Sequence, residues 1–225
     1  MFKPITHIIY DVDGLLLDTE SLNEKINSTI AQRYDKTFNL DLKMAIAGRT
    51  TIDSATIIVN TLQLPLTVEA YLAERNKLIY PLYPSCQTLP GAIKLIEHLS
   101  CHQIPQALAS SSSRHHFGLK TINHQQWVKL FQVVTLGDDC ELKHGKPAPD
   151  IFLLTAQRLN AAPQQCLVFE DSIAGMQAAK EAGMSVIAIP DPIFDHDLFT
   201  AADQVLNSLL EFQPQVWNLP AYSFL

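Results

Sequence analysis

The sequence predicts an α/β fold, in which a Rossmann-like, doubly wound parallel sheet carries an inserted helical domain. Short apolar runs alternate with helical patterns, as is typical of βαβ units in a parallel sheet. One stretch, residues 19–83, contains only amphipathic helical patterns and so breaks this alternation. The chain has 225 residues, 47% of them hydrophobic, which is enough to bury a full core.

Six short apolar runs predict the strands of the sheet. They are too short for helices, and several end in polar or acidic residues where a helical pattern begins. The predicted strands are His7–Tyr10, Gln106–Ala109, Gln132–Thr135, Cys166–Phe169, Ser185–Ile189 and a weaker one at Gln204–Leu206.

Four helical patterns connect these strands. They are Gly91–Leu99, Arg114–Gln126, Asp150–Leu159 and Ser172–Ala182. Gly183 directly follows the last of them and acts as its C-terminal stop.

The inserted stretch predicts four further helices, at Leu22–Tyr34, Leu42–Ala47, Ile52–Leu62 and Val68–Leu82. Pro81, Pro84 and Pro90 mark its exit, because proline stiffens the path back to the sheet. We therefore expect a core domain formed by residues 1–17 and 86–225, and a helical domain formed by residues 18–85.

Composition excludes several function classes. Charged residues make up 17% of the chain and its net charge is −7, without the basic run that would follow a nucleic-acid backbone. The four cysteines are widely spaced and show neither a zinc pattern nor a disulfide framework. Scattered thiols fit a reducing cytoplasm, and with neither a secretory signal nor an apolar run long enough to span a bilayer we expect a soluble cytoplasmic protein that binds no membrane. The expected form is a monomer or a weak dimer.

Polar residues at the ends of the predicted strands are the candidate site, since ligands of open parallel sheets bind beyond the carboxyl ends of the strands. Each cluster alone is common in loops and helix starts: a serine run often caps a helix, and an acidic pair often opens one. The string D-x-D-G-x-x-x-D-T that starts at Asp11 differs, because its chance occurrence in such a chain is on the order of 10⁻⁴. The other clusters are Ser110–Ser113, the loop Lys143–Pro147 and the pair Glu170-Asp171.

Together these residue types fit phosphate chemistry. Several carboxylates at one spot repel each other unless a cation neutralises them, and oxygen ligands suit Mg²⁺. A carboxylate beside that metal can attack phosphorus and form an acyl phosphate, and a second carboxylate can transfer the proton. A lysine and hydroxyl groups then offset the charge of the phosphoryl oxygens.

These motifs resemble those of the haloacid dehalogenase superfamily of phosphotransferases. The four matching segments are Asp11–Gly14 with Asp18-Thr19, Ala107–Ser110, Gly145–Asp150, and Val168–Ser172 with Gly175. The resemblance implies that Asp11 is the nucleophile and that Asp13 is the general acid/base and gives Mg²⁺ a backbone carbonyl. It also implies that Asp171, with Glu170, holds the Mg²⁺ and that Ser110 and Lys146 bind the phosphoryl group.

The inserted helices are similar to the C1 cap of that superfamily, which selects the substrate. Glu20 and Arg49 are therefore candidate substrate contacts on the cap, and Ser111 is a candidate backbone donor. The segments Leu136–Asp139, His144–Pro147 and Leu206–Pro214 most resemble the pseudouridine 5′-phosphatase branch. The expected partner is thus a small phosphorylated metabolite, either a nucleoside phosphate such as pseudouridine 5′-phosphate or a sugar phosphate.

Two alternatives stay open. A phosphomutase similar to β-phosphoglucomutase would pass the phosphoryl group to a second hydroxyl, with a cap histidine positioning the acid/base, whereas Asp18–Ser21 contains no histidine. A catalytically silent binding protein of the same fold should have lost at least one motif residue, and all are present. Dehalogenation, the third chemistry of this superfamily, does not need a carboxylate such as Asp13.

Overall fold

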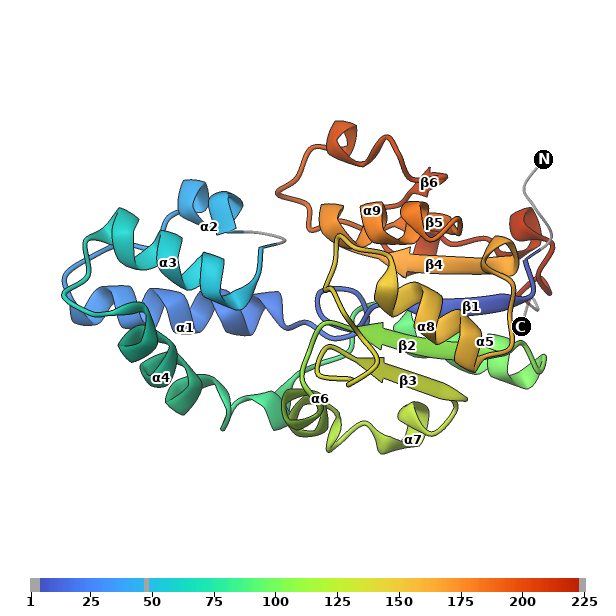
Figure 1. Cartoon of the computed structure of the whole chain (residues 1–225), viewed down its shortest axis with the longest axis horizontal. Helices are drawn as coiled ribbons and strands as arrows, with labels where there is room; N and C mark the ends of the chain where they lie inside the picture. Colours follow the sequence, from blue (N-terminus) through green and yellow to red (C-terminus); the bar gives the residue numbers. More distant parts are fainter. Residues whose placement is uncertain (1–4, 47–48, 223–225) are drawn as a thin grey trace.

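The computed structural model describes residues 5–46 and 49–222 and confirms the predicted α/β fold. Six parallel strands form one sheet in the order β3-β2-β1-β4-β5-β6 (Figure 1). Their bounds are β1 His7–Tyr10, β2 Gln106–Ser110, β3 Val133–Leu136, β4 Cys166–Glu170, β5 Ser185–Ala188 and β6 Gln204–Val205. Each coincides with a predicted strand to within one or two residues at either end. In this order β1 lies between β2 and β4, so the loops after these three strands meet at one edge.

Helices cover both faces of the sheet because alternate strand residues point to opposite sides. Ile8 and Tyr10 belong to one hydrophobic cluster with α5 (Ala92–Cys101) and α7 (Gln125–Val128). Ile9, between them, belongs to a second cluster with α8 (Asp150–Arg158) and α9 (Ile173–Glu181). The one-turn helices η4 (Leu209–Glu211) and η5 (Pro214–Trp217) complete the first layer, and η2 (Pro163–Gln165) and η3 (His196–Phe199) lie in connecting segments.

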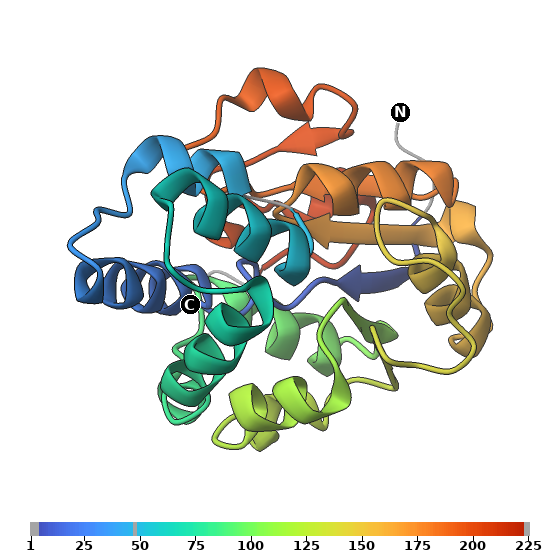
Figure 2. The ribbon, with the colours of Figure 1, turned by 60° about the vertical axis from the view of Figure 1, so that its left-hand side comes forward.

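The inserted segment forms four helices with a hydrophobic cluster of their own. They are α1 Glu20–Arg33, α2 Leu40–Ile46, α3 Thr51–Leu62 and α4 Val68–Ile79. Ile26, Ile58 and Tyr71 are buried among them, so the group does not depend on the sheet for its core. Figures 1 and 2 show this helical group beyond the carboxyl ends of the strands, away from both chain termini in Figure 1.

Two adjacent chain segments join the helical group to the sheet. Leu17, on the way out, pairs with Thr88 on the way back, and the backbone N–H of Asp18 donates to the carbonyl of Gln87 at 2.9 Å. The one-turn helix η1 (Tyr83–Ser85) lies just before this pairing. The exact domain boundaries at residues 17/18 and 85/86 stay a prediction.

Two predicted helices differ from the observed ones by more than the one or two residues found at the other helix ends. α4 ends at Ile79 instead of continuing to Leu82, because Pro81 has no N–H with which to continue the helical hydrogen bonds. The predicted helix Arg114–Gln126 is divided into α6 (Arg114–Thr121) and α7. Between them the N–H of His124 donates to the carbonyl of Thr121, a tight turn that ends the first helix. Ala47, which was expected to end the second cap helix, lies outside the described residues.

Candidate active site

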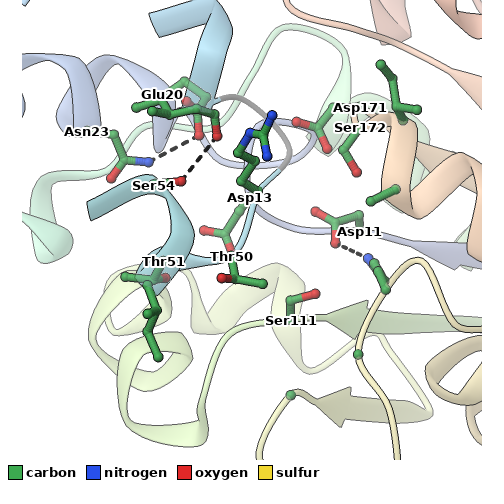
Figure 3. Close-up of a pocket in the computed structure, with 18 of the residues that line it drawn as sticks. Asp11, Asp13, Glu20, Asn23, Thr50, Thr51, Ser54, Ser111, Asp171 and Ser172 are labelled. Atoms are coloured by element: carbon green, nitrogen blue, oxygen red, sulfur yellow. Dashed lines mark hydrogen bonds and ion pairs between the residues drawn. The ribbon is translucent and has the colours of Figure 1, made fainter. Parts of the chain in front are cut away.

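A cleft of about 1080 Å³ lies between the carboxyl ends of the strands and the helical group. Asp11 and Asp13 follow β1, Ser111 follows β2, and Asp171 follows β4, and all four line the cleft (Figure 3). Lys146 reaches the same place from the loop after β3. The topology thus brings together side chains that are up to 160 residues apart in the sequence.

Lys146 connects the carboxylates at the bottom of the cleft. Its Nζ donates to Asp11 Oδ1 at 2.6 Å, to Glu170 Oε1 at 2.6 Å and to the carbonyl of Ala109 at 3.1 Å. The side chains of Lys146, Asp11 and Glu170 are 7%, 8% and 0% exposed. Because ion pairs shielded from water are little screened, this contact fixes Asp11 firmly.

The cleft has more negative charge than Lys146 neutralises. Burial raises the pKa of Asp11 to about 7, and Glu170 and Asp13 contribute in the same direction against Lys146. Burial, followed by Glu170 and Asp11, also raises the pKa of Asp171 well above its ordinary value. Two carboxylates that face the cleft would therefore gain from a nearby cation.

The donors around Asp11 and Asp171 fit a hard divalent cation. All are oxygen atoms, and Mg²⁺ prefers one or two carboxylates with backbone carbonyl, water and phosphate oxygens. A Cβ on Gly14 would come within 2.2 Å of Asp171 Oδ2, so glycine at this position leaves room for that carboxylate. In residues 5–46 and 49–222, no group of three or more His, Cys, Asp or Glu side chains could hold a metal alone. The remaining ligands would thus have to be backbone, water or substrate oxygens.

Glu170 does not face the cleft, in contrast to its expected role as a metal ligand. It is 0% exposed, and its Oε2 accepts from the backbone N–H groups of Asp171 and Ser172 at 3.1 Å and from Ser172 Oγ at 3.0 Å. With Oε1 bound to Lys146, the carboxylate has donors on both oxygens. Glu170 therefore anchors Lys146 and the start of α9, and Asp171 alone of the acidic pair lines the cleft.

Asp13 is held by a different set of donors. Its Oδ2 accepts from Ser110 Oγ at 3.2 Å and from Ser112 Oγ at 2.8 Å, and its Oδ1 forms an ion pair with Lys120. Burial alone would raise the pKa of Asp13, but Lys120 and the two hydroxyls hold it below its ordinary value. Ser110 is 0% exposed and contacts Asp13 instead of opening into the cleft.

Lys120 and Ser112 were not identified from the sequence. Ser112 was grouped with a serine run of the kind that often caps a helix, and Ser113 is indeed the residue that caps α6. Lys120 lies on the same face of α6 as Phe117 and Thr121, all three of which are buried. A lysine on the apolar face of an amphipathic helix was the signal that could have revealed it.

The helical group contributes polar side chains along one face of α1. Glu20, Asn23 and Asn27 are three or four residues apart and line the cleft. Asn23 Nδ2 donates to Glu20 Oε1 at 3.1 Å, and Arg75 Nη2 from α4 donates to Asn23 Oδ1 at 2.6 Å. Burial, ahead of the charges of Asp13 and Asp191, raises the pKa of Glu20.

Arg49 lines the same cleft, and its Nε donates to the carbonyl of Ala45 at 2.7 Å. Gly48, the residue directly before Arg49, lies outside the described residues. Among the described residues that line the cleft, His144 is the sole histidine, and its side chain is 74% exposed.

We also find no helix among the described residues with the length and apolar character needed to cross a membrane.

The chain is similar to known proteins over most of its length. The family model of the haloacid dehalogenase-like hydrolases matches residues 8–189. The (DL)-glycerol-3-phosphatase 1, mitochondrial, of Arabidopsis thaliana is 43% identical over 97% of this chain and 75% of its own length. A probable pseudouridine-5′-phosphatase of Drosophila melanogaster is 38% identical over 99% of this chain and 98% of its own length. Among solved structures, a candidate β-phosphoglucomutase from Thermotoga maritima is 27% identical, with a TM-score of 0.76 over 92% of this chain and 96% of its own.

Proposed function

The chain belongs to the haloacid dehalogenase-like hydrolase family, and from this premise we propose that it is a Mg²⁺-dependent phosphatase of small phosphomonoesters that reacts through Asp11. The observation that carries the proposal is the buried contact of 2.6 Å between Lys146 Nζ and Asp11 Oδ1 at the bottom of an open cleft. Relatives named for phosphatase activity, which align over nearly the whole chain, support the same reaction class.

Mg²⁺ would be held by the carboxylates of Asp11 and Asp171 and by the backbone carbonyl of Asp13. When bound, it would offset the negative charge of the carboxylates and of the substrate phosphate. The excess of buried negative charge around Asp11 and Asp171 supports this assignment. We assign Glu170 to anchoring Lys146 and not to the metal.

Asp11 would carry the phosphoryl group between two chemical steps. Its free oxygen attacks phosphorus, so that an O–P bond to Asp11 forms while the bond to the leaving oxygen breaks. Asp13, once it has taken up a proton from solvent, gives that proton to the leaving oxygen, which departs as an alcohol. Asp13 then takes a proton from water, which attacks the aspartyl-phosphate and releases inorganic phosphate. Lys146 keeps Asp11 in place and stabilises the charge on the phosphoryl oxygens.

The helical group would act as a cap that selects the leaving alcohol. Glu20 and Asn23 offer a carboxylate and an amide, which suit the hydroxyl groups of a polyol, a sugar or a nucleoside. Arg49 and the backbone of Ser111 are assigned contacts with the substrate. A nucleoside, sugar or polyol phosphate is the expected substrate class, and a cytoplasmic monomer or weak dimer is the expected form.

A phosphate-release screen tests this function. The purified protein is incubated with p-nitrophenyl phosphate, glycerol 3-phosphate, pseudouridine 5′-phosphate and sugar phosphates, in Mg²⁺ or in EDTA. We expect release from at least one ester in Mg²⁺, loss of activity in EDTA, and recovery when Mg²⁺ is restored. Asp11→Asn should be inactive while keeping the melting temperature of a folded protein. An Asp11→Asn variant as active as the parent, or a parent inactive on every ester, would refute the assignment.

A phosphomutase is the second candidate, because the fold is shared with the candidate β-phosphoglucomutase from Thermotoga maritima. The segment Asp18–Ser21 has no histidine, and His144 points its largely exposed ring to solvent at the rim, which weakens this alternative. Incubation with β-glucose 1-phosphate separates the two activities. Glucose 6-phosphate without free phosphate would identify a mutase, whereas free phosphate and glucose identify the phosphatase.

A further inference from the structure

The most unusual charged group outside the expected motifs is Lys120. It lies on α6 and is 2% exposed, although lysine is among the residues least often buried. Its Nζ pairs with Asp13 Oδ1 and donates to Ser112 Oγ at 2.6 Å. On its other side the ring of Tyr83 lies 5.5 Å from Nζ, measured to the ring centroid.

Such a placement is costly unless the ammonium group has a partner. An unpaired charge removed from water loses far more free energy than one hydrogen bond returns. Asp13 supplies the negative charge, and Ser112 and the Tyr83 ring occupy further directions around the ammonium group. The ion pair therefore constrains both side chains, because moving Asp13 away would leave the buried ammonium group of Lys120 without a negative partner.

The contacts of Asp13 are independent of those of Asp11. Lys146 binds Asp11 and Glu170, whereas Lys120, Ser110 and Ser112 bind Asp13. The two carboxylates that follow β1 thus have separate cations, carried by separate loops and helices. Loss of Lys120 would change the position of Asp13 while leaving the contact between Lys146 and Asp11 intact.

The place of Lys120 is also fixed by its helix. Ser113 Oγ caps α6 by accepting from the N–H of His116, and the ring of His116 lies 2.8 Å from the hydroxyl of Tyr80. Tyr80 and Tyr83 belong to the segment that returns from the helical group to the sheet. The helix that carries Lys120 is therefore packed against this return segment.

We propose that Lys120 is a positioning residue for Asp13: with Ser112, it holds the carboxylate where it exchanges a proton with the leaving oxygen. This inference rests on the proposed phosphatase function and adds a residue that none of the motif positions contains. Lys120 acts through Asp13 and contacts neither phosphate nor the leaving group.

The test compares two esters of similar size that differ in their need for a proton. p-Nitrophenyl phosphate releases a stable anion without protonation, whereas benzyl phosphate releases an alkoxide that must be protonated. kcat/KM reports the steps up to formation of the aspartyl-phosphate, so it isolates the first proton transfer. General acid catalysis contributes about 10² to 10⁴ in rate, so Lys120→Met should lower kcat/KM for benzyl phosphate by ~30-fold or more and for the nitrophenyl ester by less than ~3-fold.

Four further variants, one of them a double variant, make the result specific. Asp13→Asn should show the same selective loss, and adding Lys120→Met to it should cause no additional loss. Ser112→Ala, a smaller change, should show the same selectivity with a smaller loss, which keeps the inference testable if Lys120→Met does not fold. Lys180→Met is the control: it removes the ion pair between Lys180 Nζ and Asp203 Oδ2, 2.8 Å apart at the surface of the sheet domain. It should leave the ratio of the two kcat/KM values unchanged.

Equal losses on both esters, or no loss on either, would overturn the role of Lys120 and leave it a structural residue. So would an additive loss in the double variant. Failure of the underlying function is recognised separately, because then Asp11→Asn would keep the activity of the parent on p-nitrophenyl phosphate.

Discussion

At the residue scale, the site is governed by how the charge of each carboxylate is compensated. Glu170 has donors on both oxygens, and Asp13 has a lysine and two hydroxyl groups. Asp11 shares Lys146 with Glu170, and Asp171 has neighbouring negative charges that outweigh the lysine. The two under-compensated carboxylates, Asp11 and Asp171, both line the cleft beside the expected phosphate position, which is where a cation is useful.

This imbalance predicts a pH-dependent stability of the metal-free protein. The pKa of Asp11 is about 7 in the folded state and near 3.8 in the unfolded chain. Between pH 3.8 and 7, Asp11 therefore binds a proton in the folded state but not in the unfolded chain. The stability that this proton contributes is complete below about pH 4 and is lost as the pH rises to about 7. Asn at position 11 does not titrate, so the parent should lose on the order of a few kcal/mol relative to Asp11→Asn across this range.

Thermal or urea unfolding in EDTA at pH 4 to 8 measures the difference between the two proteins. Mg²⁺ should stabilise the parent more at pH 8 than at pH 5, because protons compete with the cation for the same carboxylates. If the unfolding free energies of the parent and of Asp11→Asn changed in parallel with pH, the raised pKa of Asp11 would be contradicted.

Several residues that line the cleft were predicted from the sequence, but not all of their contacts were. Asp11, Asp13, Lys146 and Asp171 were found because each directly follows a strand or lies in a strand-end loop, where topology alone sets the location. Lys120 was missed because it lies within a helix, seven residues beyond the serine run. Its role depends on α6 bringing the side chain to Asp13 in the loop after β1, which a one-dimensional pattern does not contain.

At the scale of single elements, the first turn of α9 is built around Glu170. A Cβ on Gly175 would lie 1.8 Å from Glu170 Oε1 and 2.2 Å from Oε2, closer than any real contact. Gly118, in α6, is exposed and has no atom within 4 Å of the corresponding position. The two helical glycines thus differ in their surroundings, and only the first is required by its neighbours.

Alanine at these two glycines should have opposite effects. Gly175→Ala should displace Glu170, lower the melting temperature and reduce activity, since Glu170 anchors Lys146. Gly118→Ala should raise the unfolding free energy by about 0.5–1 kcal/mol, because alanine restricts the unfolded chain and favours helix. Thermal unfolding and kcat of both variants provide the measurement. An unchanged melting temperature and kcat in Gly175→Ala would show that the first turn of α9 can rearrange to accommodate the methyl group.

The elements themselves were predicted more reliably than their ends. All six strands were predicted because short, strongly apolar runs bounded by polar residues are typical of buried strands and too short for most helices. The end of α4 was placed too late even though Pro81 was recognised, since amphipathic periodicity continued past it. The residues between α6 and α7 include no proline or glycine that would predict a break. The turn there is stabilised by a distant segment, because Nε2 of His124 lies 2.7 Å from the carbonyl oxygen of Cys86.

At the scale of the whole molecule, the sheet and the helical group meet on two sides of the cleft. On one side lie the paired connecting segments at Leu17 and Thr88. On the other, Lys43 Nζ of α2 lies 3.3 Å from Asp191 Oδ2, in the segment after β5. Lys43 also pairs with Glu24 at 2.9 Å, so its position within the helical group is fixed. The contact with Asp191 therefore helps to set the orientation of the helices over Asp11 and Asp13.

Breaking this bridge should affect substrate capture more than stability. The side chains of Lys43 and Asp191 are 18% and 25% exposed, so Asp191→Asn should change the unfolding free energy by less than ~1 kcal/mol. A more open cleft should raise KM by about 3- to 10-fold at low salt with kcat changed by less than ~2-fold, because closure gates access and not chemistry. High salt screens a partly exposed pair and should bring the KM of the parent toward that of the variant. Lys180→Met, which removes a partly exposed ion pair within the sheet domain, serves as the control. An unchanged KM in Asp191→Asn would show that the connecting segments alone orient the helical group.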